Sequence, residues 1–62
     1  MDANRLIDKI IEKGLNVSDA LFICNKIADQ ESLTIGDVIQ IKNMLNLTNL
    51  EAIEVFYEDL QI

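Results

Sequence analysis

The side chains of this sequence that are able to take part in chemistry are eleven carboxylates and one thiol, because the chain contains no histidine. Histidine is the most common general base in enzymes, and a cysteine becomes a nucleophile only beside a base or a positive charge. Helical periodicity places Cys24 on the apolar side of its helix and the carboxylates on outer, solvated sides. The sequence also lacks metal-ligand spacings and a glycine-rich phosphate loop. We therefore expect a protein without enzyme activity, metal or cofactor.

Acidic side chains recur along one face of the last predicted helix. Glu51, Glu54 and Glu58 fall on one side at about 100° per residue, and Asp59 follows them. Like charges four residues apart repel, and acids near a helix C-terminus oppose the helix macrodipole. Such a row is either a solvated outer face or a binding surface for a protein partner with a basic surface. If it binds, changing the three glutamates to glutamine should raise thermal stability and weaken target binding.

Two apolar side chains are expected to add to this protein-partner surface. Phe22 falls among polar residues on the outer side of the second predicted helix, and Met44 lies opposite the apolar arc of the third. Exposed aromatic residues often anchor interfaces. For Phe22, packing beneath a neighbouring helix is an equal alternative.

The basic side chains define a second candidate surface. Arg5, Lys9 and Lys13 recur at every fourth position on the outer side of the first predicted helix, and Lys26 is the only base in residues 15–33. Together they could contact DNA phosphates. The alternative for the first three is an ordinary face of salt bridges to acids of the same helix. The net charge of −6 does not attract nucleic acid over the whole surface.

Capping signals divide the chain into helices. Thr34 with Asp37 and Thr48 with Glu51 have the spacing of capping boxes, and Asn46 stands where a helix end favours a left-handed residue. We expect an all-α fold, a compact bundle of about four short helices in a single small domain, residues 1–62. The expected helices span about residues 3–13, 17–29, 35–45 and 49–60.

The expected core is the apolar arc of each helix. These arcs contain Ala3, Leu6, Ile7, Ile10 and Ile11 in the first helix, Val17, Ala20, Leu21, Cys24, Ile27 and Ala28 in the second, Ile35, Val38, Ile39, Ile41 and Leu45 in the third, and Leu50, Ile53, Phe56, Tyr57 and Leu60 in the fourth. Half of the residues are hydrophobic, and a chain this short buries only about 60% of its unfolded surface. The composition therefore favours a homodimer or a large contact with a partner.

One stretch and the end of the first helix carry a resemblance to a known family. The segments concerned are Leu33-Thr34-Ile35-Gly36-Asp37-Val38, Ile41, Leu45-Asn46-Leu47-Thr48, Glu51-Ala52, Phe56-Tyr57 and Lys13-Gly14-Leu15. They resemble small Cro/repressor-type helix-turn-helix proteins of phages and mobile elements. Residues 15–33 depart from the family because they contain no glycine and no arginine, and they fit one helix better than two. The resemblance thus implies a degenerate helix-turn-helix scaffold, and no base-contacting residue is carried over.

Two functions follow from these patterns. The first is a small acidic phage-type helical protein that binds and inhibits another protein, as antirepressors and anti-CRISPR proteins do. The alternative is a dimeric Cro-like DNA-binding transcriptional regulator. In both, the absence of a signal peptide and of a membrane-spanning run leads us to expect a protein of the bacterial cytoplasm without a membrane partner.

Overall fold

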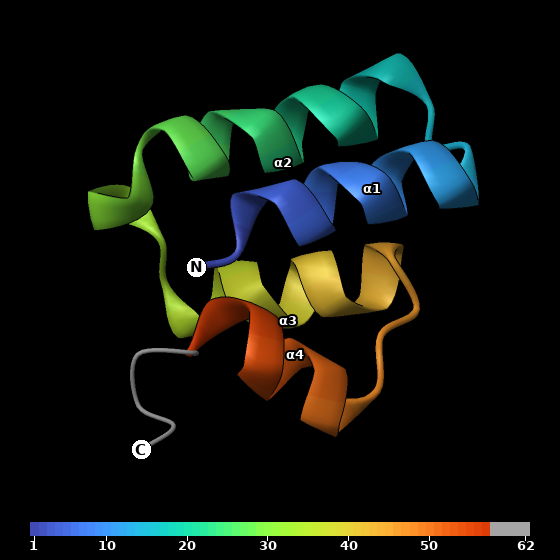
Figure 1. The fold of residues 1–62 in the computed structure, drawn as a ribbon. Helices are drawn as coiled ribbons and strands as arrows, with labels where there is room; N and C mark the ends of the chain where they lie inside the picture. The colour runs from blue at the N-terminus through green and yellow to red at the C-terminus, as the bar shows by residue number, and fades with distance from the viewer. Residues whose placement is uncertain (58–62) are drawn as a thin grey trace.

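The computed structural model describes residues 1–57, and these residues form four α-helices and one short 3-10 turn (Figure 1). The elements are α1 (Ala3–Lys13), α2 (Val17–Ala28), the turn η1 (Gln30–Ser32), α3 (Ile35–Met44) and α4 (Asn49–Phe56). This part of the chain contains no strand. The predicted all-α bundle of about four short helices is confirmed.

The helix bounds agree with the predicted ones except at the end of α4. This helix was expected to reach residue 60 but ends at Phe56, because Tyr57 leaves the helical conformation with φ −124° and ψ 32°. Residues 58–60 lie outside the described part of the chain. Between Gly14 and Thr34 the chain forms one α-helix followed by η1. The single continuous helix that the periodicity favoured there is thus confirmed.

Each of the two capping boxes forms as predicted. The Thr34 hydroxyl oxygen accepts the backbone N–H of Asp37 at 3.1 Å, and the Asp37 carboxylate accepts the backbone N–H of Thr34 at 3.1 Å. Thr48 and Glu51 make the same reciprocal pair at the start of α4, again at 3.1 Å. Both helix starts are therefore fixed by side chains three residues apart in the sequence.

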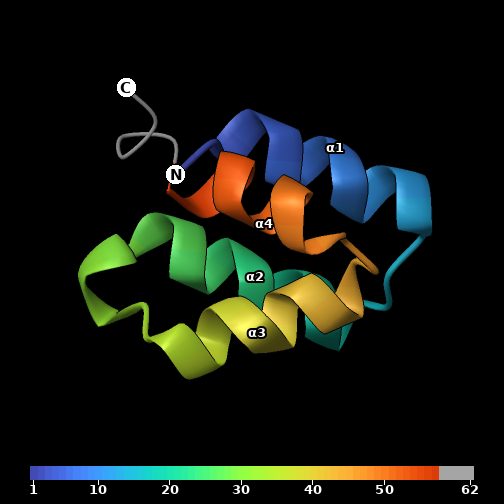
Figure 2. The same cartoon turned by 90° about the horizontal axis from the view of Figure 1, so that it is seen from below.

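Left-handed residues end two of the helices. Gly14 has φ 64° after α1, and Asn46 has φ 54° between α3 and α4. Glycine and asparagine are the residues that adopt this conformation most readily. The two turns reverse the chain, so that α2 runs back beside α1 and α4 runs back beside α3 (Figures 1 and 2).

The four helices surround one core. α1 lies beside both α2 and α4, and α3 lies beside α4. The backbone N–H of Asp2 donates to the carbonyl oxygen of Val55 at 2.7 Å, which ties the start of α1 to the end of α4. The buried core residues are Leu6, Ile23, Val38, Ile41, Leu45, Leu47, Ala52, Val55 and Phe56.

The predicted apolar arcs were wrong on one side of each helix. In α2 the fully buried residue is Ile23, which the predicted arc did not contain, whereas Val17 and Leu21 are 75% and 55% exposed. Cys24, expected in the core, is also exposed. α2 is apolar around most of its circumference, so periodicity alone did not select the side that faces the core.

The other three helices show the same error. Each helix buries only a stripe that is narrower than its apolar arc. The reason is that its neighbours cover only the side that faces the core, and its outer side is open to solvent. The large side chains that were expected inside and are exposed in these helices are Ile7 and Ile11 of α1, Ile35 and Ile39 of α3, and Leu50 and Ile53 of α4.

We expect Asn46→Ala to lower the free energy of unfolding by about 1 kcal/mol, since alanine tolerates a positive φ poorly. Asn46→Gly should cost nothing, because glycine adopts this conformation freely. Thermal unfolding measures both, with a shift of the midpoint of about 4–8 °C per kcal/mol for a domain of this size. Asn43→Ala, at an exposed position inside α3, is the matched control. Equal losses for Asn46→Ala and Asn43→Ala would contradict the role of the turn.

Candidate functional site

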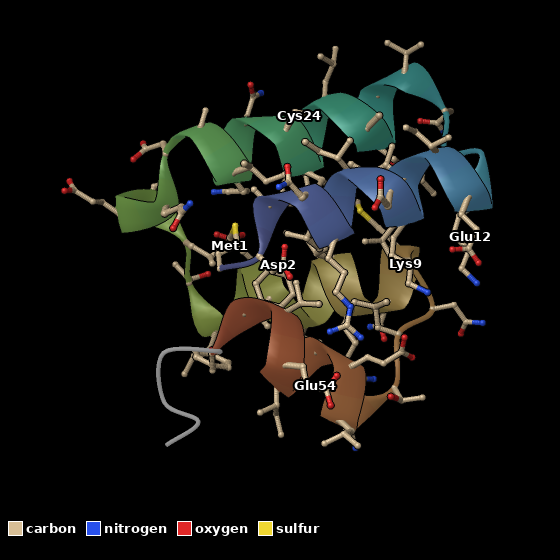
Figure 3. All side chains as sticks on the ribbon, viewed as in Figure 1. Met1, Asp2, Lys9, Glu12, Cys24 and Glu54 are labelled. Atoms are coloured by element: carbon tan, nitrogen blue, oxygen red, sulfur yellow. The ribbon has the colours of Figure 1, made fainter. Side chains whose placement is uncertain are left out.

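The predicted acidic row and the predicted basic row lie against each other along the seam between α4 and α1. The Arg5 guanidinium lies 3.2 Å from the Glu54 carboxylate. The Lys9 ammonium lies 3.6 Å from Glu51 and 3.6 Å from Glu12. Figure 3 shows Lys9 on α1 and Glu54 on α4, on the sides where these helices face each other. Two surfaces that the sequence presented as alternatives thus neutralise one another within the chain.

Glu51 is held by its own helix as well as by α1. The backbone N–H of Thr48 and, to a smaller extent, the Lys9 ammonium hold the pKa of the Glu51 carboxyl below its usual value. At neutral pH Glu51 is therefore ionised, and its carboxylate both caps the start of α4 and pairs with Lys9. Glu58 and Asp59, the other members of the predicted acidic row, lie outside the described residues.

A second charged contact joins α2 to the start of α3. The Lys26 ammonium lies 3.0 Å from the Asp37 carboxylate and 5.7 Å from the centre of the Phe22 ring. The pKa of Asp37 is lowered first by the backbone N–H of Thr34 and then by Lys26. Lys26, proposed from the sequence as a phosphate contact, thus also has an acidic partner in the chain.

Phe22 and Met44 are not the exposed contacts that the sequence suggested. Both side chains are half-buried and pack against the core. For Phe22 the reason is its place on α2, beside the Lys26 contact with α3. Packing of Phe22 against the core agrees with the alternative considered for it, and a contact of Phe22 or Met44 with a partner stays a prediction.

The remaining predicted phosphate contact, Lys13, is exposed and has no ion pair within residues 1–57. Arg5, Lys9 and Lys26 would have to exchange carboxylate partners for phosphates to bind DNA. The structure therefore pairs four of the charged residues that were predicted as binding sites with one another, namely Arg5 with Glu54 and Lys9 with Glu51.

The exposed apolar side chains form two faces that the sequence did not indicate. Ile7, Ile11, Val17 and Leu21 make up the α1–α2 face, and Ile35, Ile39, Leu50 and Ile53 make up the α3–α4 face. In each helix one flank of the buried stripe carries the ion-paired residues that face one neighbour. In the view of Figure 1, α1 and α2 lie in the upper part of the molecule, and α3 and α4 lie in the lower part.

A positional regularity in the sequence could have indicated part of these faces. Val17 and Leu21 are the first and fifth residues of α2, and Ile35 and Ile39 are the first and fifth residues of α3. Each pair follows a residue that caps its helix, Asn16 or Thr34. A capping residue followed by aliphatic residues at the first and fifth helix positions thus occurs at two helix starts. This repeat is visible in the sequence, but the width of the apolar arc alone does not show it.

Neither a pocket nor a cluster of three or more possible metal ligands is found among residues 1–57. No helix in this part of the chain is both long and apolar enough to cross a membrane. A scan against models of known protein families, a search of curated proteins and a search of solved structures each return no match to the chain. The expected lack of enzyme activity and the resemblance to Cro/repressor-type proteins therefore stay predictions.

Glu54→Gln should lower the free energy of unfolding by about 0.2–1 kcal/mol at low salt, because Arg5 loses its partner. This sign is the reverse of the stabilisation expected from sequence for Glu51, Glu54 and Glu58 changed together, where repulsion between glutamates and the helix macrodipole were considered but not the contact with Arg5. Urea unfolding of Glu54→Gln, Arg5→Gln and the double variant gives the coupling between the two side chains. Additive losses in the double variant would show that the contact contributes nothing.

The pH dependence of stability should depend on Asp37 and Glu51. Their pKa values are lower in the folded chain than in the unfolded chain, so their stabilisation is complete above the usual carboxyl pKa of about 4. It is lost as the pH falls through the lowered folded values. Between neutral pH and about pH 2, the midpoint temperature of thermal unfolding should therefore fall less steeply for Asp37→Asn/Glu51→Gln than for the wild type.

The control for this experiment is Asp8→Asn/Glu31→Gln. The carboxylates of these two residues have no hydrogen bond or ion pair within the described residues. The control variant should keep the steepness of the wild type. A wild-type slope in the Asp37→Asn/Glu51→Gln variant would show that the two capping carboxylates do not govern acid stability.

Proposed function

We propose that the protein is a small acidic helical interaction module that binds another protein and inhibits it, as an antirepressor or an anti-CRISPR protein does. The proposed partner has a basic surface, and it docks on the α1–α2 face. The observation that carries this proposal is a set of exposed aliphatic side chains on a helix pair whose exposed carboxylates, except Glu12, have no partner within the described chain.

The apolar part of the α1–α2 face supports a protein partner. Ile11 and Val17 are about three-quarters exposed, and Leu21 is more than half exposed. Burying such a side chain fully stabilises a complex by about 1.5–3 kcal/mol relative to leaving it in water. Several exposed aliphatic residues on one helix pair of a small protein favour an interaction site there.

The charged border of this face supports a basic partner. Asp8 and Glu12 lie on the exposed side of α1 next to Ile11, and Asp29 and Glu31 follow α2 on exposed backbone. Of these, only Glu12 has an ion pair in the described chain, and it shares Lys9 with Glu51. A basic rim on the partner would pair with these acids while the aliphatic centre excludes water.

A role for the acidic row in partner binding remains a separate hypothesis. Glu51 and Glu54 would have to exchange Lys9 and Arg5 for basic groups of the partner, at a cost that the α1–α2 face does not incur. The acids of the α1–α2 face are therefore the better placed carboxylates for a first contact.

The alternative function, a dimeric Cro-like DNA-binding regulator, would need Arg5, Lys9 and Lys26 to leave their carboxylate partners. Titration into labelled random-sequence duplex DNA at low salt separates the two functions. Binding at about micromolar protein, with an affinity that falls steeply as salt rises, would support the regulator. We expect no binding, because the exposed acids repel the duplex.

The proposed function is tested by capture from a lysate of the bacterial host with three immobilised proteins: wild type, Leu21→Asp and Ile39→Asp. The two substituted residues are matched, since each is the fifth residue of its helix and they are 55% and 52% exposed. We expect the wild type and Ile39→Asp to retain one basic protein that Leu21→Asp loses. With the purified partner, Leu21→Asp should weaken binding roughly tenfold or more. Equal retention by both variants would contradict docking on the α1–α2 face.

A further inference from the structure

We propose that the α3–α4 face is the contact surface for a second copy of this chain, in a symmetric dimer whose two copies meet through the same residues. This inference goes beyond the proposed partner site, because it concerns the other helix pair. It rests on the distribution of carboxylates, on the exposed aliphatic side chains and on a glycine that the fold of a single copy does not require.

The distribution of carboxylates separates the two faces. Residues 33–57 contain three carboxylates, Asp37, Glu51 and Glu54. Each of them turns toward a base of the other helix pair: Asp37 to Lys26 at 3.0 Å, Glu51 to Lys9 at 3.6 Å and Glu54 to Arg5 at 3.2 Å. The outer side of α3 and α4 is left with aliphatic and uncharged polar side chains and the half-buried Lys42.

This separation selects a second copy as the occupant of the α3–α4 face. Two copies of a chain with net charge −6 repel each other unless they approach through surfaces without carboxylates. Approach through the α1–α2 face would bring the exposed Asp8 and Glu12 of both copies together. Among residues 33–57, approach through the α3–α4 face opposes only carboxylates that are each paired with a base of their own copy. A basic partner, in contrast, gains little from acids that are already paired.

The apolar content of the face is what a small dimer needs. Ile35 and Leu50 are well exposed, and Ile39 and Ile53 are about half exposed, so that twofold symmetry would bury eight such side chains. A standard interface covers about 800 Å² of each partner, roughly a fifth of the 4155 Å² that the chain exposes. Oligomerisation is a common means of stabilising chains of this length.

Gly36 is the third observation. It lies in the first turn of α3 beside Ile35, and an added Cβ would meet only the Thr34 hydroxyl oxygen, at an ordinary 3.6 Å. Glycine in a helix is destabilising relative to alanine, and packing within one copy gives no reason for it here. A helix of a second copy could approach the backbone closely at this position.

The dimer is tested by analytical ultracentrifugation of the wild type, Ile35→Asp and Val17→Asp from about 1 μM to about 1 mM. The two variants are matched, because each substitution is at the first residue of a helix and the residues are 73% and 75% exposed. Aspartate in the first turn favours the helix macrodipole, so neither change should unfold the chain. Circular dichroism checks this.

We expect the wild type and Val17→Asp to form dimers, and Ile35→Asp to remain monomeric or to dimerise at least tenfold more weakly. Gly36→Leu should also weaken the dimer while keeping its helices, because the added side chain has room in one copy but not between two. A monomeric wild type over the whole range would overturn the proposal. So would equal weakening by Ile35→Asp and Val17→Asp, or an unchanged dimer in Gly36→Leu. Partner capture by Ile35→Asp tests the α1–α2 face separately, since that face is unaltered.

Discussion

The width of the core is the constraint on which the rest of this structure depends. Four helices of eight to twelve residues enclose a core to which each contributes one narrow stripe, such as Leu6 in α1 and Ile23 in α2. The sequence provides aliphatic residues for a much wider arc. The aliphatic residues that do not fit in the core must therefore lie at the surface, where they lower the solubility of the protein unless another molecule covers them. Both apolar faces follow from this mismatch between a hydrophobic sequence and a small interior.

The charged residues are arranged around the same constraint. On each helix one flank of the buried stripe is charged and meets the opposite charge of a neighbour, as Arg5 meets Glu54 and Lys26 meets Asp37. These contacts are partly exposed, so each contributes little to stability. Their larger effect is to determine which charged side chains remain without an ion-pair partner. Three of the five bases pair with acids of α3 and α4, whereas Asp8 of α1 and the acids Asp29 and Glu31 after α2 have no ion-pair partner among the described residues.

The result is a molecule with two chemically different sides. One side combines aliphatic residues with free carboxylates, and the other combines aliphatic residues with uncharged polar ones. A basic partner and a second copy have different electrostatic requirements, so the two sides are suited to different occupants. A dimer formed through α3 and α4 would present two copies of the α1–α2 face.

The sequence by itself determined the local structure of this protein. The capping boxes at Thr34 and Thr48, the left-handed turn at Asn46 and the stop at Gly14 involve residues at most five positions apart, so their patterns specify the helix starts and turns directly. Only the tertiary structure decided which flank of each helix is buried, because helices such as α2 are apolar on several sides and the choice depends on neighbours distant in sequence. For the same reason, it alone revealed that the acidic and basic rows pair with each other and that Leu21 and Ile39 face the solvent.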